Sequence, residues 1–362
     1  MRHLPLLARC GALALLLAAC DDAPVAPSLH SSGGNAADSR PSRDFSVSLA
    51  GVALRPGVTA DLVARVYVDE RGPSCDARGT VMAVYGFAHT AATWGPLAEA
   101  LFTPGPNPVC RVIALDLPGH GASGVPDALP FTFLTLGDYA GAVDGALTRL
   151  AAAGLPSRGI VAHSQGGMVV QMLQQQLVDG GSSLRGAHGI DAVVLMAPTM
   201  PDGESWAFVE SGLAGQLLAA FLAPDQSRFA IPDAVWPILF FSRASDGALV
   251  PTAPSGADVT ALGYNAPEPL LSALQLVGAP PFPSRPVIGE GIFAPSRGTL
   301  LSVVAFDEDQ IVRPAEASAL YDRLAGPVPL RAFFTVTGPE SVHDMFVSNP
   351  TAMFADVRVG LP

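Results

Sequence analysis

The sequence contains no lysine: its 20 basic residues are all arginines, and they face 32 aspartates and glutamates, giving a net charge of -12. A chain of this charge repels nucleic-acid phosphates, so the composition argues against a nucleic-acid partner. Charged residues make up only 14% of the chain and hydrophobic residues 49%. Beyond the N-terminus, no apolar run is long enough to span a bilayer. These proportions favour one large globular domain with a single core.

The first 20 residues have the layout of an export signal. Arg2 and Arg9 supply a positive end, residues 11–19 form a short apolar core, and the segment ends on Leu17-Ala18-Ala19-Cys20. This ending resembles a bacterial lipoprotein signal, in which the thiol is acylated, so we expect Cys20 to carry a lipid anchor. An ordinary secretory leader cut near Cys20 is the alternative. Both predict export, and the first predicts anchoring in the bacterial cell envelope, facing the periplasm or the surface.

Few cysteines remain once the leader is set aside. Cys75 and Cys110 each precede an apolar run that we expect to form one of two neighbouring parallel strands, which would bring both thiols to the same end of the sheet. In an exported protein this arrangement predicts a disulfide, which would contribute roughly 3 to 4 kcal/mol of stability; two buried free thiols are the alternative. No cysteine or histidine spacing indicates a metal site, and we expect no cofactor.

The rest of the chain divides by composition. Residues 21–44 contain almost no bulky side chains and are interpreted as a flexible tether. In residues 45–198 and again in 299–362, strands and helices alternate after an initial antiparallel pair of strands. This alternation predicts a three-layer α/β/α sandwich around a mostly parallel sheet of eight strands. After the antiparallel pair, strands are expected at residues 81–85, 112–116, 160–163, 190–196, 300–306 and 330–336.

Residues 199–298 interrupt this alternation and are too long for a connection inside a compact domain, so we interpret them as a cap or lid insertion. Taken one at a time, their aromatic side chains fit a small core belonging to the insertion itself. Taken together, they would give an apolar lid that favours substrates with an apolar part. These aromatic residues are Trp206, Phe208, Phe221, Phe229, Trp236, Phe240, Phe241, Phe282 and Phe293.

Residues 159–170, GIVAHSQGGMVV, place Ser164 where a buried strand turns abruptly into a helix. The first three residues are typical of a strand end, and apolar residues from Met168 onward recur at three- and four-residue steps, as on one face of a helix. Ala162 and Gly166 are small enough for the backbone to fold back sharply. A serine in such an elbow exposes its hydroxyl at the edge of the sheet, which predicts a nucleophile.

A serine nucleophile needs an imidazole as base and a carboxylate that orients the imidazole. Both types of residue follow Ser164 at the ends of expected strands. His343 is the only histidine after His188, and we interpret it as the base. Asp307 and Asp309 both follow the strand expected at residues 300–306, and either is a candidate for the orienting acid.

The chain resembles α/β-hydrolases with a cap domain over roughly residues 45–361. The resemblance rests on the order Ser, Asp, His and on three motifs: AHSQGG around Ser164, YGF ending at Phe87, and DLPGHG starting at Asp116. It implies Ser164 as nucleophile, His343 as base and Asp309 rather than Asp307 as orienting acid. It also implies an oxyanion hole formed by the backbone N–H groups of Phe87 and Gln165. Asp116, His120 and His163 match supporting positions of the family, without chemistry of their own.

Two positions depart from the family pattern. Tyr85 stands where the family often has histidine before the glycine of the oxyanion loop, and Ala162 stands where the elbow often begins with glycine. An oxyanion hole built from backbone groups survives both changes, because neither removes an N–H group. We expect the two departures to alter substrate range rather than the reaction.

A serine nucleophile disfavours the dehalogenase and epoxide hydrolase activities of the family, which use aspartate. We expect hydrolysis of a small-molecule carboxylic ester with an apolar acyl or aryl part through an acyl-enzyme. Acyl transfer, amide or peptide cleavage and C–C bond hydrolysis use the same three residues and are alternatives, because they differ in lid shape. A non-catalytic envelope binding protein is disfavoured because no member of the Ser-His-Asp set is missing.

Overall fold

A computed structural model describes residues 42–71, 75, 79–104, 108–200, 241–243, 249–251, 266–277, 286–309, 311–328, 331–338 and 341–362. The predicted leader with Cys20 lies outside the described residues, as does nearly all of the predicted tether. The last residues of that tether are an exception. They belong to the first strand, which begins at Ser42 because Ser42 pairs with Asp69 of the second.

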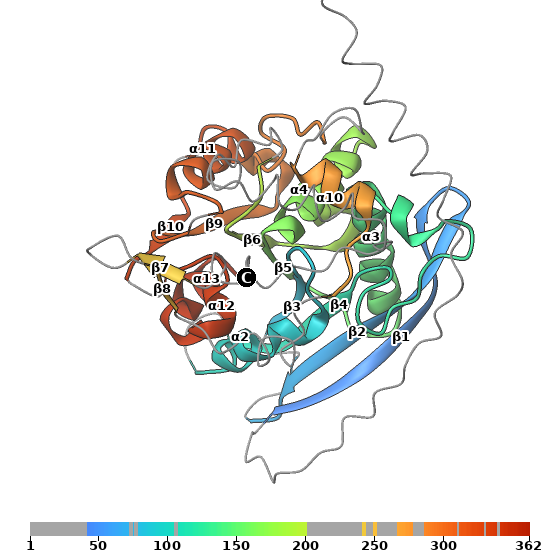
Figure 1. Ribbon diagram of the computed structural model, residues 1–362, viewed down its shortest axis with the longest axis horizontal. Helices are drawn as coiled ribbons and strands as arrows, with labels where there is room; N and C mark the ends of the chain where they lie inside the picture. Colours follow the sequence, from blue (N-terminus) through green and yellow to red (C-terminus); the bar gives the residue numbers. More distant parts are fainter. Residues whose placement is uncertain are drawn as a thin grey trace, which may run out of the picture. The chain divides into compact units, whose positions relative to one another are not determined.

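The predicted eight-stranded, mostly parallel sheet is confirmed (Figure 1). Only β1 and β2 break the parallel arrangement: β2 runs antiparallel to both β1 and β4. A separate antiparallel pair joins β7 (Phe241–Arg243) and β8 (Leu249–Pro251). The order across the main sheet is β1 (Ser42–Arg55), β2 (Val58–Asp69), β4 (Val109–Asp116), β3 (Gly79–Val84), β5 (Gly159–His163), β6 (Ala192–Met196), β9 (Leu300–Phe306) and β10 (Phe333–Val336).

The register brings the carboxyl ends of the parallel strands to one edge. Val84 at the end of β3 pairs with Ala162 of β5, and His163 pairs with Met196 at the end of β6. Phe306 and Val336, the last residues of β9 and β10, pair with each other. The loops after β3, β5, β9 and β10 therefore leave the sheet along the same edge, although they lie far apart in the sequence.

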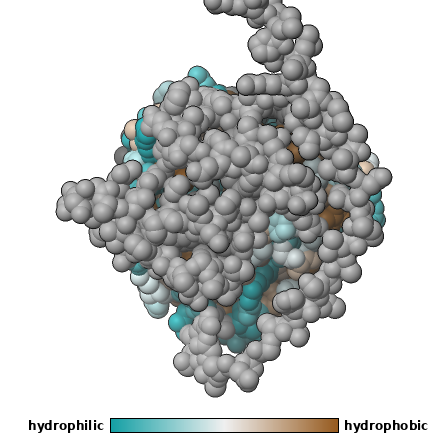
Figure 2. All heavy atoms as spheres, viewed as in Figure 1, coloured by the Kyte–Doolittle hydropathy of each residue, from teal (hydrophilic) through white to brown (hydrophobic). Residues whose placement is uncertain are grey.

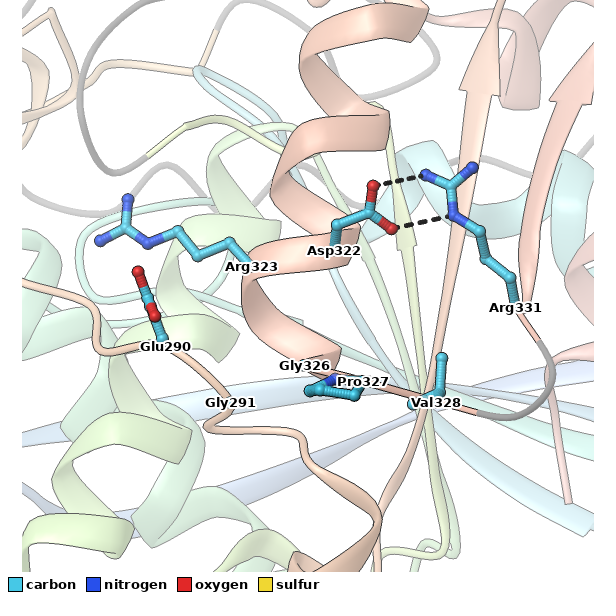
Figure 3. A pocket seen from close by; sticks show the side chains of 8 residues that line it. All are labelled: Glu290, Gly291, Asp322, Arg323, Gly326, Pro327, Val328 and Arg331. Atoms are coloured by element: carbon cyan, nitrogen blue, oxygen red, sulfur yellow. Dashed lines mark hydrogen bonds and ion pairs between the residues drawn. The ribbon is translucent and has the colours of Figure 1, made fainter.

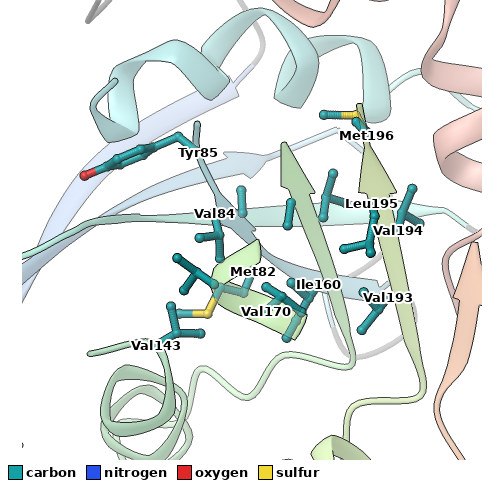
Figure 4. Packing of buried hydrophobic residues seen from close by; sticks show 14 of the residues in the cluster. Met82, Val84, Tyr85, Val143, Ile160, Val170, Val193, Val194, Leu195 and Met196 are labelled. Carbon is teal, nitrogen blue, oxygen red and sulfur yellow. The ribbon is translucent and has the colours of Figure 1, made fainter. Parts of the chain in front are cut away.

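Apolar residues on both faces of the central strands form the core. Every residue of β5 and β6 is buried, as expected for parallel strands covered on both sides. Figure 4 shows Met82, Ile160 and Val193 of three adjacent strands in contact with side chains from the helices, among them Val143 and Val170. Continuous apolar runs, rather than alternating ones, are therefore what these strand positions require.

Helices cover both faces of the sheet, as the three-layer prediction requires (Figure 1). On one face, α2 (Gly95–Leu101) contacts α12 (Met345–Ser348) and α13 (Phe354–Val359). On the other face, α3 (Leu136–Ala152) packs against α4 (Gln165–Asp179), and α10 (Leu270–Val277) packs against α3. Helix α11 (Pro314–Ala325) covers the same face of the sheet as α4. The segment around Ile292 hydrogen-bonds to both helices.

Shorter elements lie between these helices and strands in the described residues. A 3-10 turn, η1 (Ala91–Trp94), directly precedes α2. The helical C-terminal segment is interrupted after α12 at Pro350, which has no N–H to continue a helix. The remaining short elements are η2 (Phe131–Phe133), α5 (Leu184–His188), η3 (Pro295–Arg297) and η4 (Pro350–Ala352).

Cys75 and Cys110 form a disulfide, with their Cα atoms 5.4 Å apart. Cys110 lies in β4, and Cys75 precedes β3, the parallel neighbour of β4. The bond closes a chain segment with a sequence separation of 35. It therefore restrains the connection into β3, where the sheet changes from antiparallel to parallel pairing.

Much of the predicted cap lies outside the described residues, but its last part packs on the main core. Ile288, Ile292 and Phe293 belong to the same buried cluster as the central strands. Phe293 therefore contributes to the core of the sheet domain rather than to a separate core of the insertion. Residues 266–277, also within the predicted cap, include α10 and hydrogen-bond to the loop after β3.

The described part of the surface carries few large exposed hydrophobic side chains. Val287 and Leu300 are the most exposed of them. Figure 2 shows both hydrophilic and hydrophobic residues among the described atoms that are visible on this face. Among the described helices, none combines the length and the hydropathy of a membrane span.

Candidate active site

Ser164 occupies a strained backbone position between β5 and α4. Its φ of 50° and ψ of -119° lie in a region that residues with a Cβ rarely adopt. Hydrogen bonds hold the residue on both sides: its N–H donates to the carbonyl of Met196 at 3.0 Å, and its carbonyl accepts from Gly167 at 2.9 Å. The turn directs the hydroxyl to the carboxyl edge of the sheet, and only 7% of the residue is exposed.

Two glycines permit this turn. A Cβ on Gly166 would lie 2.3 Å from the carbonyl oxygen of Val84, so only glycine lets α4 approach the end of β3 this closely. A Cβ on Gly86 would lie 2.9 Å from Nδ1 of His163 and 3.1 Å from Cβ of Ser164. The loop after β3, which carries Phe87, therefore lies directly against the elbow.

His343 reaches Ser164 from the loop after β10. Its Nε2 lies 2.9 Å from Oγ of Ser164. The backbone of the same residue is also fixed, because its carbonyl lies 2.9 Å from Nε2 of His163, the residue before the serine. The elbow thus contacts both the imidazole and the main chain of His343.

Asp309 and Asp307 have different partners. Oδ2 of Asp309 lies 2.8 Å from Nδ1 of His343, and its Oδ1 accepts from the N–H groups of Ile311 at 2.6 Å and Val312 at 2.9 Å. Asp307 instead accepts from the hydroxyl of Ser341 and from the backbone of Gly338. Of the two acids, only Asp309 contacts the imidazole, and the three groups expected to converge do lie together.

Charge on Asp309 sets the protonation of His343. Burial lowers the pKa of the imidazole, but the charge and hydrogen bond of Asp309 outweigh it, with a further contribution from Asp344. The pKa of His343 therefore lies above that of an ordinary histidine. An acceptor at Nδ1 also fixes the ring tautomer, leaving Nε2 to accept the proton of the serine hydroxyl.

His89, His163 and Asp344 form a buried cluster behind the imidazole. Their ligand-type atoms lie within 4.8 Å of one another, and they are the group among the described residues that could hold a metal ion. Nε2 of His163, however, already faces the carbonyl of His343. Burial raises the pKa of Asp344 to about 7, against the opposing effect of the charge on His343. A proton on Asp344 removes the penalty of a buried charge without a metal.

The proposed oxyanion donors come from the loop after β3 and from the first residue of α4. Gln165 is the first residue of α4, so its N–H has no carbonyl partner within the helix, and the helix dipole favours negative charge there. Phe87 lies in the loop after β3, between Gly86 and Ala88. Ala88 has a φ of 57°, a second strained position next to a proposed donor.

Sequence reasoning missed Glu268. This residue is fully buried, and its carboxylate accepts hydrogen bonds from the loop after β3 and from the side chain of Gln165. It falls inside the predicted cap, where no local pattern marks it. The one available signal is an isolated acid in an otherwise apolar stretch, between Pro267 and Pro269.

A pocket on the described surface lies away from these residues (Figure 3). It contains Glu290, Asp322 and Arg331, the last two joined by an ion pair, at the C-terminal end of α11. Because α11 runs from the end of β9 back to the start of β10, this end lies at the opposite edge of the sheet from Ser164. The pocket takes no part in the arrangement around the serine.

A serine at a strained strand-to-helix elbow, on a sheet of this order, is the arrangement of α/β hydrolases. The sequence comparison agrees, because the profile described as "Alpha/beta hydrolase family" matches residues 86–357. The chain therefore belongs to the alpha/beta hydrolase family of enzymes. None of the curated proteins compared with the chain matches its sequence.

Solved structures share the fold at low sequence identity. An esterase from Thermogutta terrifontis has a TM-score of 0.53 and 18% identity, covering 87% of this chain and 97% of its own. An esterase from Rhodococcus sp. has a TM-score of 0.53 and 20% identity, covering 88% and 98%. The enol-lactonase from Burkholderia xenovorans has a TM-score of 0.50 and 17% identity, covering 82% and 95%. These similarities establish a common fold.

The contact between Asp309 and His343 predicts a specific pH dependence. Catalysis by a neutral imidazole should rise with pH through the raised pKa of His343, so the acid limb of kcat/KM should lie above about pH 6.5. Asp309→Asn should move that limb to lower pH and reduce kcat by about 10⁴-fold, because the favoured tautomer is lost. Steady-state kinetics from pH 4 to 9 on a fluorogenic ester would measure both effects.

Asp307→Asn is the matched control, since Asp307 contacts Ser341 and Gly338 instead of the imidazole. Asp307→Asn should keep the acid limb of kcat/KM at the pH of the wild type and should keep most of the activity. A large loss of kcat in this variant, with Asp309→Asn near the wild type, would reverse the assignment of the two acids.

Proposed function

We propose that this hydrolase cleaves carboxylic esters that have an apolar acyl or aryl part, through a covalent acyl-enzyme on Ser164. The observation that carries the proposal is the pair of contacts made by His343: 2.9 Å from Nε2 to Oγ of Ser164 and 2.8 Å from Nδ1 to Asp309. A hydroxyl, an imidazole and a carboxylate in this order make a serine nucleophilic near neutral pH.

In the first half of the reaction, Oγ of Ser164 attacks the ester carbonyl carbon while Nε2 of His343 takes the hydroxyl proton. The carbonyl oxygen becomes an oxyanion, and the N–H groups of Phe87 and Gln165 stabilise it. Asp309 stabilises the imidazolium that forms. The intermediate then collapses: the bond to the alcohol oxygen breaks, and His343 returns its proton to that leaving group.

In the second half, a water molecule occupies the place of the departed alcohol. His343 removes a proton from this water, whose oxygen attacks the acyl carbon and regenerates the oxyanion. Collapse then breaks the bond to Oγ, and the serine recovers its proton from His343. The carboxylic acid leaves, and the enzyme returns to its starting state without any redox or metal chemistry in these steps.

The proposed preference for an apolar acyl or aryl group rests on the residue composition of the predicted cap and on Phe87. The aromatic residues of the predicted cap would give an apolar covering to the acyl or aryl group, and the half-buried Phe87 packs against the core beside Ser164. The relatives of similar fold include two esterases and an enol-lactonase, which act on acyl–oxygen bonds. Acyl transfer, amide cleavage and C–C hydrolysis are alternatives on the same residues.

A fluorophosphonate probe should label the wild-type protein and fail to label Ser164→Ala, because the probe reacts only with an activated serine. In-gel fluorescence would measure the labelling, with heat-denatured wild type as control. His343→Ala should label at least about a hundredfold more slowly, since the base is gone. A folded wild type that takes up no label would contradict the proposal.

Esters should be hydrolysed faster than matched amides. A series of p-nitrophenyl esters of rising chain length, run beside the corresponding anilides, should give the highest kcat/KM for medium or long apolar acyl groups. Equal or faster turnover of the anilides would contradict the ester assignment and favour an amidase. The released p-nitrophenol and p-nitroaniline are measured by absorbance.

We also propose that the protein is exported and held in the cell envelope by a lipid on Cys20. Expressed in a bacterial host with radiolabelled palmitate, the full chain should incorporate label and sediment with membranes, whereas Cys20→Ser should lose the label. The unlabelled variant should keep its esterase activity, because Cys20 precedes the domain. Equal labelling of both proteins would refute anchoring at this cysteine.

A further inference from the structure

Glu268 is a fully buried carboxylate that precedes α10 and lies far in the sequence from all of its partners except Ser272. Its Oε1 accepts from Nε2 of Gln165 at 2.9 Å, from the hydroxyl of Tyr139 at 3.3 Å and from the hydroxyl of Ser272 at 2.5 Å. Its Oε2 accepts from the N–H of Ala88 at 3.1 Å and faces Nε2 of His120 at 3.1 Å. Five donors from five parts of the chain thus converge on one side chain.

The surroundings keep this carboxylate ionised. Burial raises the pKa of Glu268, but the hydrogen bond and charge of His120, with those from Ser272 and Gln165, lower it below the ordinary value. The ring of His120 has an acceptor at each nitrogen, because Nδ1 lies 3.2 Å from the carbonyl of Pro118. The carboxylate of Glu268 therefore faces an imidazole that is held at both of its nitrogens.

Glu268 controls the strained loop after β3. Ala88, at a φ of 57°, is fully buried, and both of its backbone groups are held by the segment that carries Glu268. Its N–H donates to Oε2 of Glu268, and its carbonyl accepts from the N–H of Ala266 at 2.8 Å. A positive φ outside glycine persists only where neighbouring contacts enforce it. Ala88 directly follows Phe87, so these contacts fix the peptide groups on the C-terminal side of a proposed oxyanion donor.

The same carboxylate holds the second proposed donor. Gln165 supplies its backbone N–H to the oxyanion hole, and its buried side chain donates to Oε1 of Glu268. One side chain therefore bridges the loop after β3 and the first residue of α4, the two elements that must keep a fixed separation for both N–H groups to reach one oxygen atom. Stabilisation of an oxyanion depends steeply on such placement.

We propose that Glu268 is a positioning residue for the oxyanion hole, which sets the spacing between the N–H groups of Phe87 and Gln165 from outside the Ser-His-Asp set. This inference rests on the proposed serine-hydrolase function and deepens it. The segment that carries Glu268, which lies within the predicted cap, then has a part in catalysis, because it completes the transition-state site.

The test compares Glu268→Gln with Asp69→Asn. Glu268→Gln keeps the shape of the side chain, removes its charge and replaces one acceptor oxygen with a donor. Asp69 is also a buried carboxylate, 3% exposed, and it accepts hydrogen bonds from Arg71. It is the last residue of β2 and lies at the opposite edge of the sheet from Ser164. Both variants should lower Tm, which thermal unfolding would measure.

The kinetic measurements distinguish a residue that positions the oxyanion hole from one that only anchors α10. Glu268→Gln should reduce kcat by about 10- to 100-fold while KM for a p-nitrophenyl ester stays within about threefold, because a misplaced oxyanion hole weakens the transition state more than the ground state. The inhibition constant of a boronic acid, which forms a tetrahedral adduct with the serine oxygen, should rise by a similar factor. Asp69→Asn should change neither value by more than about twofold.

A carboxylate that only anchored α10 would give a different result. Glu268→Gln would then lower Tm and leave kcat and boronate affinity close to those of Asp69→Asn, which would overturn the inference. Ester hydrolysis and fluorophosphonate labelling by the wild type are measured in parallel. Their absence would refute the proposed function itself, so the two failures are distinguishable.

If Glu268→Gln does not fold, single hydrogen bonds to the same carboxylate can be removed instead. Ser272→Ala and Gln165→Met each delete one donor to Oε1, and the second keeps its backbone N–H. Each should reduce kcat by about 3- to 10-fold with KM little changed, and together they should lose less than the product of the two factors, because both act through Glu268. Unchanged kcat in both would also overturn the inference.

Discussion

Ser164 sits with a φ of 50°, hydrogen-bonded through its own carbonyl and N–H to Gly167 and Met196. The other groups of the site are arranged around this strained backbone. The strain arises because α4 must begin in contact with the end of β3. At Gly166 this contact is so close that there is no room for a side chain. Burial of the central strands and of the apolar face of α4 offsets the strain. The hydroxyl is thereby fixed at the one edge where the loops after β9 and β10 also arrive.

The buried carboxylates Asp309 and Glu268 near this edge each have an imidazole as a close partner. Asp309 faces His343, and Glu268 faces His120, so neither carboxylate is left alone in a medium of low dielectric. Asp344 has no such hydrogen bond, and its pKa is raised to about 7, where a proton relieves the charge. Fixed, paired charges orient dipoles and imidazoles in advance of the reaction, which is how such a site lowers a barrier without reorganising.

Fold similarity and chemistry have different sources in this chain. The solved relatives share the sheet and its helices at identities of 17% to 20%, because many apolar sequences fill the same layers. The reaction is argued from side chains at the carboxyl edge, since one fold supports many chemistries through its loops. Tyr85 illustrates the difference. It departs from the common family residue, yet it is fully buried and its oxygen accepts from Leu117, so it supports the loop after β3 rather than the reacting atoms.

Periodicity and glycine placement are local properties of each segment. They were therefore enough to predict the order of strands and helices along the chain, the eight-stranded sheet and the elbow at Ser164. The sequence could also name His343, as the only histidine late in the chain, whereas the choice of Asp309 over Asp307 came from the family resemblance and not from the local pattern. Only the tertiary structure separates those two acids, since the turn after β9 directs one to the imidazole and the other to Ser341. Glu268 was likewise out of reach. Its partners come from four distant segments and from α10, the helix that follows it. Burial and pairing across such distances leave no pattern in neighbouring residues.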